Sequence, residues 1–126
     1  ERIHDLIEHV GDGMDIYSGD DGTAMESMLV GGKGNISVVA NVVPRLMSDM
    51  CLAATAGERE RAERLDADMQ GLHTALFMEA NPIPVKWALQ DMGWIEAGIR
   101  LPLTPLAEHF HDHVREALRG LDLLRD

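Results

Sequence analysis

The segment from Met14 to Pro44 constrains the fold of this chain more than any other part of the sequence. Residues 14–18 form a short run with an isoleucine and a tyrosine between two glycines, which predicts a strand. Helically spaced apolar residues follow and end at Gly31, and residues 36–40 are almost continuously apolar, as in a strand buried on both faces. We therefore predict one β-α-β unit with two parallel strands, which needs neighbouring strands on both edges.

The remainder of the sequence predicts helices. Residues 1–10 place their apolar side chains on one helical face. After the β-α-β unit, helical periodicity covers residues 44–56, begins again near residue 58, and returns from Pro84 to residue 92. A last helix is expected to begin with Thr104 as its cap, because a proline follows at the first helical position.

Composition narrows the possible partners. The 126 residues include 22 acidic and 11 basic side chains, a net charge of −11, without a basic stripe. Nucleic acids and anionic membranes are therefore not expected partners. No apolar run is long enough to cross a bilayer, and the single Cys51 has the helical spacing of a buried, reduced thiol, which favours a cytoplasmic protein. The mixed charges near residue 60, which include Asp66, predict a solvated helix face.

Two carboxylates, Asp20 and Asp21, follow the first predicted strand, at the end where α/β proteins build their sites. Adjacent side chains diverge and make a poor acid–base pair, so we favour capping of the next helix over catalysis. The run Gly31–Gly34 has the glycine content of a phosphate loop, but the required motif is absent and the order is helix then strand. We interpret it as a turn, with Lys33 at the end of the strands opposite any site.

Histidines and a second lysine are further candidates for chemistry. His109 and His113 are four residues apart and share a helical face, which could hold a metal. No third ligand is evident and His111 points elsewhere, so we favour surface histidines and expect no metal. Lys86, in the first turn of a predicted helix, is expected to pair with Glu79 or to be solvated. Neither a Ser/His/Asp nor a Cys/His nucleophile arrangement can be assembled.

Four segments in order resemble the dihydrodipicolinate synthase family, also called 4-hydroxy-tetrahydrodipicolinate synthase. They are YSGDD (17–21), GGKGNISVVANVVP (31–44), EANPIPVKWAL (79–89) and RLPLTPL (100–106). The resemblance runs from end to end and keeps the spacing between segments. It implies an α/β fold, the C-terminal part of a (β/α)₈ TIM barrel. Residues 1–43 would be its last βα units, with the last two strands, and residues 44–126 a C-terminal helical extension, so that the chain itself is mostly α-helical.

In that family a lysine near the end of the sixth strand forms a Schiff base with pyruvate. The resulting enamine attacks aspartate semialdehyde to give 4-hydroxy-tetrahydrodipicolinate, toward diaminopimelate and lysine. Such imine chemistry needs a lysine that its surroundings keep deprotonated. Aligned on the family, this chain begins just after that lysine, so the resemblance implies a lyase as the parent, without a cofactor, and no activity for the chain alone. It also implies pyruvate and aspartate semialdehyde as substrates and a cytoplasmic homo-oligomer.

The resemblance carries over few site residues. Ile36 matches the pyruvate-contacting isoleucine of the family, although its pattern alone predicts a core residue. Gly19 matches a glycine that lines the same pocket, where a side chain would obstruct the ligand. Ser37 is their neighbour, and Asn35 departs from the family, which usually has an apolar residue there. The Schiff-base lysine, the catalytic tyrosine, the pyruvate-contacting threonine, the entrance arginine and the lysine-feedback site are implied to lie outside this chain.

Two other interpretations stay open. The chain could be a stand-alone helical module for binding or oligomerisation, or a fragment of a related pyruvate lyase such as N-acetylneuraminate lyase. The NPIPVK and RLPLTPL segments favour the synthase over its relatives. The start at Glu1, without a methionine and inside a helix, and the unpaired strand edges favour a fragment over a module. The isolated chain is expected to be poorly soluble or to self-associate through its strands.

Overall fold

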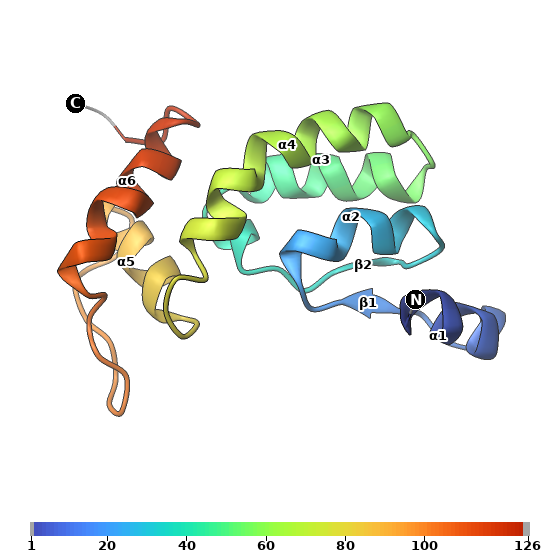
Figure 1. Cartoon of the computed structure of the whole chain (residues 1–126), viewed down its shortest axis with the longest axis horizontal. Helices are drawn as coiled ribbons and strands as arrows, with labels where there is room; N and C mark the ends of the chain where they lie inside the picture. Colours follow the sequence, from blue (N-terminus) through green and yellow to red (C-terminus); the bar gives the residue numbers. More distant parts are fainter. Residues whose placement is uncertain (1, 125–126) are drawn as a thin grey trace. The chain divides into compact units, whose positions relative to one another are not determined.

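A computed structural model describes residues 2–124, the side chain of Asp12 excepted. The chain divides into two compact units, Glu1–Ala67 and Asp68–Asp126. The first unit holds α1 (Arg2–Val10), η1 (Gly11–Gly13), β1 (Tyr17–Ser18), α2 (Asp21–Leu29), β2 (Gly34–Asn35), η2 (Val39–Asn41) and α3 (Pro44–Thr55). Helix α4 (Arg59–Ala75) runs across the division, and α5 (Ile83–Asp91), η3 (Glu108–Phe110) and α6 (His111–Arg119) complete the second unit (Figure 1). No helix within residues 2–124 has the length and apolar character needed to span a membrane.

The predicted β-α-β unit is confirmed. Strands β1 and β2 are parallel, with Tyr17 opposite Gly34 and Ser18 opposite Asn35, and α2 connects them. Within residues 2–124 these two strands are the whole sheet. The pairing continues for one hydrogen bond beyond the strands, because the Ile36 N–H donates to the Ser18 carbonyl at 2.8 Å.

The predicted second strand over residues 36–40 is wrong. Strand β2 ends at Asn35, and Val39–Asn41 forms the 3₁₀ turn η2. The cause is the Asp21 carboxylate, which accepts the backbone N–H groups of Val38 and Val39 at 2.9 and 3.0 Å and so bends the chain out of the strand direction. Val39 is therefore buried from a turn, without an extension of the sheet.

The glycine run is a turn, as predicted. Gly31 has φ +118°, a conformation that residues with a side chain rarely adopt. A Cβ at Gly32 would lie 2.7 Å from the Ser27 carbonyl oxygen, because the Gly32 N–H donates to that same oxygen. The two glycines therefore allow a tight turn between α2 and β2, in which the backbone at Gly32 lies against the end of α2.

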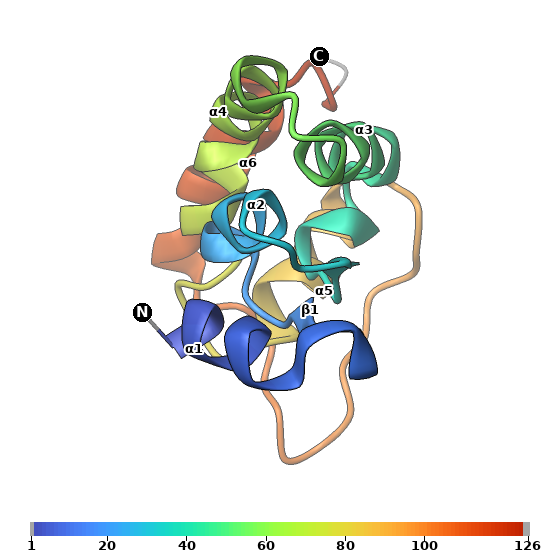
Figure 2. The same ribbon diagram turned by 90° about the vertical axis from the view of Figure 1, so that its right-hand side faces the viewer.

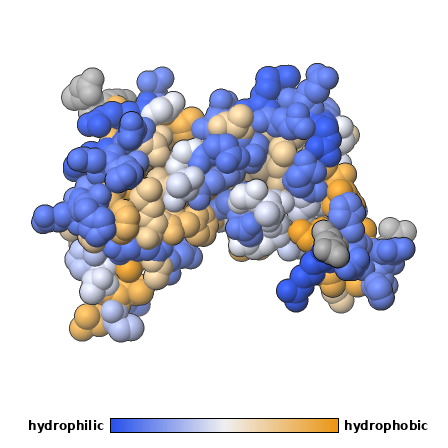
Figure 3. All heavy atoms as spheres, in the orientation of Figure 1, coloured by the Kyte–Doolittle hydropathy of each residue, from blue (hydrophilic) through white to orange (hydrophobic). Residues whose placement is uncertain are grey.

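The core of the first unit lies between α2, η2 and α3, and Figure 2 shows α2 beside α3 nearly end-on. Helix α3 begins at Pro44, as predicted, because proline suits the first turn of a helix. The buried apolar residues of this core are Ala24, Met28, Val39, Val42, Val43, Met47, Met50, Ala53 and Ala54. Figure 3 shows hydrophilic atoms over much of the drawn face, with apolar atoms reaching the surface in patches between them.

The charged face at the start of α4 is only partly solvated. Arg59 donates to both carboxylate oxygens of Glu26 on α2, at 2.6 and 3.2 Å, and these bonds hold the pKa of Glu26 below its usual value. Both side chains are about half exposed, so the pair contributes little to stability. Asp66, by contrast, is only 8% exposed, and the prediction of a solvated Asp66 is wrong.

The second unit confirms one predicted helix and corrects another. Helix α5 carries Pro84 in its first turn and is followed by Gly93 at φ +73°, as predicted. The helix start at Thr104 is wrong: the backbone is still extended at Ala107, and α6 begins only at His111. The Ala107 N–H donates to the Glu79 carboxylate at 3.2 Å, which holds this extended segment in place.

The thiol of Cys51 gives a test of the packing around α3. Burial raises its pKa, and the negative charge of Asp21 raises it further. Because the thiolate is the reactive form, we expect alkylation of Cys51 by iodoacetamide to reach half its maximal rate at a higher pH in the folded chain than in urea. Mass spectrometry of the alkylated chain over a pH series measures both midpoints. Coinciding midpoints would contradict the packing of this helix.

Candidate functional site

The carboxyl end of the parallel strand pair brings the two predicted substrate-binding residues together. Gly19 directly follows Ser18 at the end of β1, and Ile36 directly follows Asn35 at the end of β2. Because Ser18 and Asn35 are partners in the register, Gly19 and Ile36 leave the pair side by side. This is the end of parallel strands at which α/β proteins place their ligands.

The surroundings of Gly19 and Ile36 leave room for a ligand. The Ile36 residue is 73% exposed, so the core position that its pattern alone predicts is wrong. A Cβ placed on Gly19 would meet no described atom within 4 Å, and glycine is therefore not required there by packing within the chain. An exposed apolar side chain beside an open glycine suits contact with a small ligand, and their role in binding pyruvate stays a prediction.

The turn that carries Ile36 is fixed by the side chain of Asp21. This residue is 1% exposed, and its carboxylate accepts three hydrogen bonds. The Asn35 side-chain amide donates to Oδ1 at 2.7 Å, and the backbone N–H groups of Val38 and Val39 donate to Oδ2. The polar Asn35 thus has a partner that an apolar side chain would lack.

The two adjacent aspartates have different roles. Asp20 stands at the N-cap position of α2, is exposed, and accepts a hydrogen bond from the Thr23 hydroxyl at 2.7 Å. Asp21 points inward and bonds the turn after β2, so it does not cap α2 as predicted. The divergence expected of neighbouring side chains is confirmed. Nothing in the sequence pattern, apart from a position after a predicted strand, indicated the buried role of Asp21.

Lys33 lies at the opposite end of the strands. It immediately precedes β2, is exposed, and its backbone N–H donates to the Ile16 carbonyl at 2.7 Å before β1 begins. The ammonium group is therefore carried at the amino end of the pair, away from Gly19 and Ile36, as predicted. It is not placed to act on a ligand bound beside those residues.

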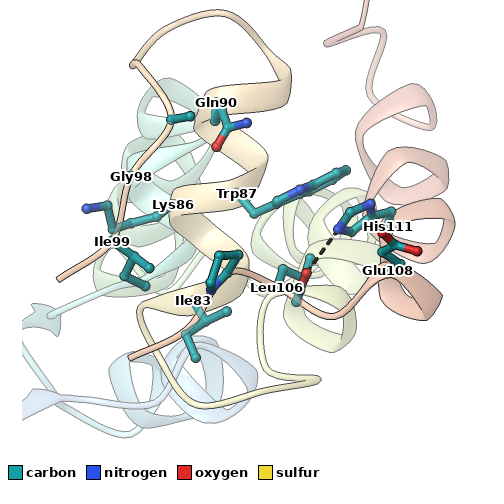
Figure 4. Close-up of a pocket in the computed structure, with 11 residues that line it drawn as sticks. Ile83, Lys86, Trp87, Gln90, Gly98, Ile99, Leu106, Glu108 and His111 are labelled. Atoms are coloured by element: carbon teal, nitrogen blue, oxygen red, sulfur yellow. Dashed lines mark hydrogen bonds between the residues drawn. The ribbon is translucent and has the colours of Figure 1, made fainter. Parts of the chain in front are cut away.

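The second unit contains a pocket of about 300 Å³, formed by α5, the segment after it and the start of α6. Lys86 and His111 both line it, but Figure 4 shows the Lys86 side chain directed toward Ile99, on the side away from Trp87 and His111. The predicted partner of Lys86, Glu79, instead accepts the backbone N–H of Ala107. The polar groups of this pocket do not converge on one point.

One wall of this pocket is a stack that sequence reasoning missed. The Trp87 ring stacks on His111 at 4.3 Å, and the Arg115 guanidinium lies 5.1 Å from the centre of the Trp87 ring. Asp91 holds Arg115 through two hydrogen bonds of 2.8 and 3.0 Å and raises its pKa. His111 Nε2 donates to the Leu106 carbonyl at 3.0 Å. The available signal was spacing: Trp87 and Asp91 are four residues apart on α5, and His111 and Arg115 are four residues apart on α6, so each pair shares one face of its helix. The stack connects α5 to α6.

The histidine cluster does not form a metal centre. His109 and His113 are exposed, and their ring centres lie 4.0 and 6.5 Å from the centre of the Phe110 ring. Among residues 2–124 no group of three or more histidine, cysteine, aspartate or glutamate side chains is placed to hold a metal ion.

Comparison with curated proteins gives consistent names. The chain is 57% identical over 119 residues to the 4-hydroxy-tetrahydrodipicolinate synthase of an Azoarcus species. The aligned region covers 94% of this chain and 41% of the relative. The protein of the same name from Pseudomonas aeruginosa is 54% identical over 124 residues, 98% of this chain and 42% of the relative. The chain thus spans about two fifths of the length of these relatives.

Solved structures and a family model agree with these names. The dihydrodipicolinate synthase of Acinetobacter baumannii, chloride inhibited and complexed with pyruvate, matches with a TM-score of 0.95 and 50% identity, over 98% of this chain and 42% of that one. The enzyme from Aquifex aeolicus matches with a TM-score of 0.94 and 36% identity, over 99% and 43%. A model of the dihydrodipicolinate synthetase family matches residues 1–121. Because this match covers nearly the whole sequence, the chain belongs to the dihydrodipicolinate synthetase family.

Proposed function

We propose that this chain forms part of a 4-hydroxy-tetrahydrodipicolinate synthase, a lyase that condenses pyruvate with aspartate semialdehyde. The observation that carries the proposal is the exposed Ile36 beside Gly19 at the carboxyl end of two parallel strands. In this function Ile36 contacts pyruvate, and Gly19 leaves the space that the substrate occupies. The parent enzyme is a cytoplasmic homo-oligomer, and its product feeds lysine and diaminopimelate biosynthesis.

The topology supports a place for this segment at the end of a (β/α)₈ barrel. In such a barrel each helix leads to another strand of the sheet. Here β2 is followed by α3, α4, α5 and α6, and residues 36–124 contain no further strand. We therefore propose that β1 and β2 are the last two barrel strands, that residues 1–43 belong to the barrel, and that residues 44–126 form the helical extension.

The Schiff-base lysine is proposed to come from another part of the parent enzyme. Lys33 lies at the amino end of the strand pair, and Lys86 belongs to the other compact unit, where it points toward Ile99. Lys33 is therefore not carried at the strand end beside Ile36. The contribution of this chain is then to bind and orient pyruvate while the nucleophile is supplied from outside it.

Reductive trapping tests this function. We expect pyruvate followed by borohydride to leave the 126-residue chain unlabelled. In a chimera this chain replaces the matching segment of the Pseudomonas aeruginosa relative, to which it is 54% identical. There we expect one labelled lysine, in the portion that the relative contributes, and condensation of the two substrates. Peptide mass spectrometry locates the label, with borohydride alone as the control. Label on Lys33 or Lys86, or a folded chimera without label, would contradict the proposal.

A further inference from the structure

We propose that Asp21 is a positioning residue for pyruvate binding, because its buried carboxylate fixes the turn from which the Ile36 side chain projects. The inference rests on the proposed function and adds a residue to it. The hydrogen bonds of the Asp21 carboxylate go to Asn35, Val38 and Val39. The carboxylate acts through the Asn35 side chain before Ile36 and through the Val38 and Val39 backbone after it, and would therefore set the position of the isoleucine side chain.

The hydrogen bonds of Asp21 enclose the turn from both ends. Its Oδ1 accepts the Asn35 side-chain amide at 2.7 Å, one residue before Ile36. Its Oδ2 accepts the backbone N–H groups of Val38 and Val39 at 2.9 and 3.0 Å, beginning two residues after Ile36. Only Ile36 and Ser37 lie between these anchor points, so the carboxylate leaves the short turn little freedom.

Two further hydrogen bonds complete the support of the turn. The Ile36 N–H donates to the Ser18 carbonyl at 2.8 Å, and the Ser37 hydroxyl accepts the Ala40 N–H at 2.8 Å. The Ile36 side chain itself is 73% exposed and gains little from packing within the described chain. Its position is therefore determined by the backbone, and the backbone is determined by Asp21.

A carboxylate suits this position because it accepts hydrogen bonds on both oxygens. An asparagine at position 21 could keep its oxygen toward the two backbone amides, but its NH₂ group would then face the NH₂ group of Asn35. Asp21→Asn would therefore either set a donor against a donor in a site that is nearly closed to water, or force the Asn35 amide to turn over and give up the contact of its NH₂ group with the Met47 sulfur at 3.8 Å. The shape of the residue is unchanged, which makes this substitution a selective probe of the hydrogen bonds.

The experiment measures the KM for pyruvate and the KM for aspartate semialdehyde separately, in the chimera with the Pseudomonas aeruginosa relative. We expect Asp21→Asn to raise the KM for pyruvate about tenfold or more, since a small misplacement of a binding group is costly. We expect the KM for aspartate semialdehyde to stay unchanged. The matched control is Asp112→Asn, which removes a carboxylate that is 97% exposed, and it should leave both KM values as they were. A merely structural role for Asp21 would instead reduce the active fraction, with kcat lowered and the pyruvate KM unchanged.

A reciprocal exchange keeps the test decisive if the single variant folds poorly. In Asp21→Asn combined with Asn35→Asp, the asparagine oxygen again accepts the two backbone amides and its NH₂ group donates to the new carboxylate. We expect the double variant to recover a pyruvate KM within about a factor of three of the unsubstituted chimera, because the two changes are coupled. Hydrogen exchange should show the Val38 and Val39 amides protected in the double variant and less protected in Asp21→Asn.

The outcomes separate this inference from the proposed function. An unsubstituted chimera that traps no pyruvate overturns the function, and the inference with it. A chimera that traps pyruvate and turns over, but whose Asp21→Asn variant keeps the pyruvate KM, overturns the inference alone. A double variant that stays as impaired in pyruvate binding as the single one also overturns it, because the negative charge of Asp21 would then matter and not its bonds to the turn.

Discussion

Replacing Met50 by alanine is expected to lower the free energy of unfolding of the chain by about 2–5 kcal/mol. Met50 is fully buried in the middle of α3, where this helix packs on α2 and η2. The substitution removes most of a large side chain from a place that the surrounding helices cannot close. Urea denaturation at one fixed protein concentration, followed by circular dichroism, measures the change.

Leu52→Ala is the matched control for this prediction. It shortens an apolar side chain two residues further along the same helix, but Leu52 is 63% exposed. We expect a change within about 0.5 kcal/mol, as for most surface substitutions. Equal losses of stability from the two variants would show that α3 does not present Met50 to the core, and the packing of the first unit would have to be revised.

The contrast between Met50 and Ile36 shows what the sequence could predict. Met50 lies in a regular helix, whose periodicity places each residue on a face from local spacing alone. Ile36 follows a strand whose end is set by hydrogen bonds to Asp21, which is 15 residues away in the sequence. An apolar run does not show where a carboxylate distant in sequence accepts hydrogen bonds from the backbone. The prediction of a strand over residues 36–40 was therefore wrong.

The same limit applies to the start of α6. Thr104 and Pro105 form a good helix start by local rules, yet the chain stays extended to Ala107, where the Glu79 carboxylate accepts its N–H.

For the candidate site the limit was different. The pattern placed Ile36 in a core, and only the resemblance to a family suggested a ligand contact. Local rules therefore located the turns and most helices, and long-range polar contacts decided the exceptions.

The isolated chain is expected to self-associate, with a weight-average mass that rises with concentration in analytical ultracentrifugation. In residues 2–124 the sheet has only β1 and β2, so each strand has one edge without a partner strand. Tyr17 and Ile36 stand at this pair and are 54% and 73% exposed. Unpaired backbone groups beside exposed apolar side chains form a template for pairing with another copy. The proposed barrel would cover these edges, so the chimera should not associate by this route.

Lysine substitutions separate association through the strands from association through other apolar surface. Tyr17→Lys combined with Ile36→Lys should shift the chain toward monomer, because charged side chains on an edge oppose pairing. The control is Leu101→Lys, at a residue that is 90% exposed but belongs to the second compact unit, and it should leave the association unchanged. If Leu101→Lys alone abolished association, the loop after α5 would be the contact surface. If the unsubstituted chain were a monomer with a sharp melting transition independent of concentration, the strand edges would be stable in water without a partner sheet, and the prediction would be wrong.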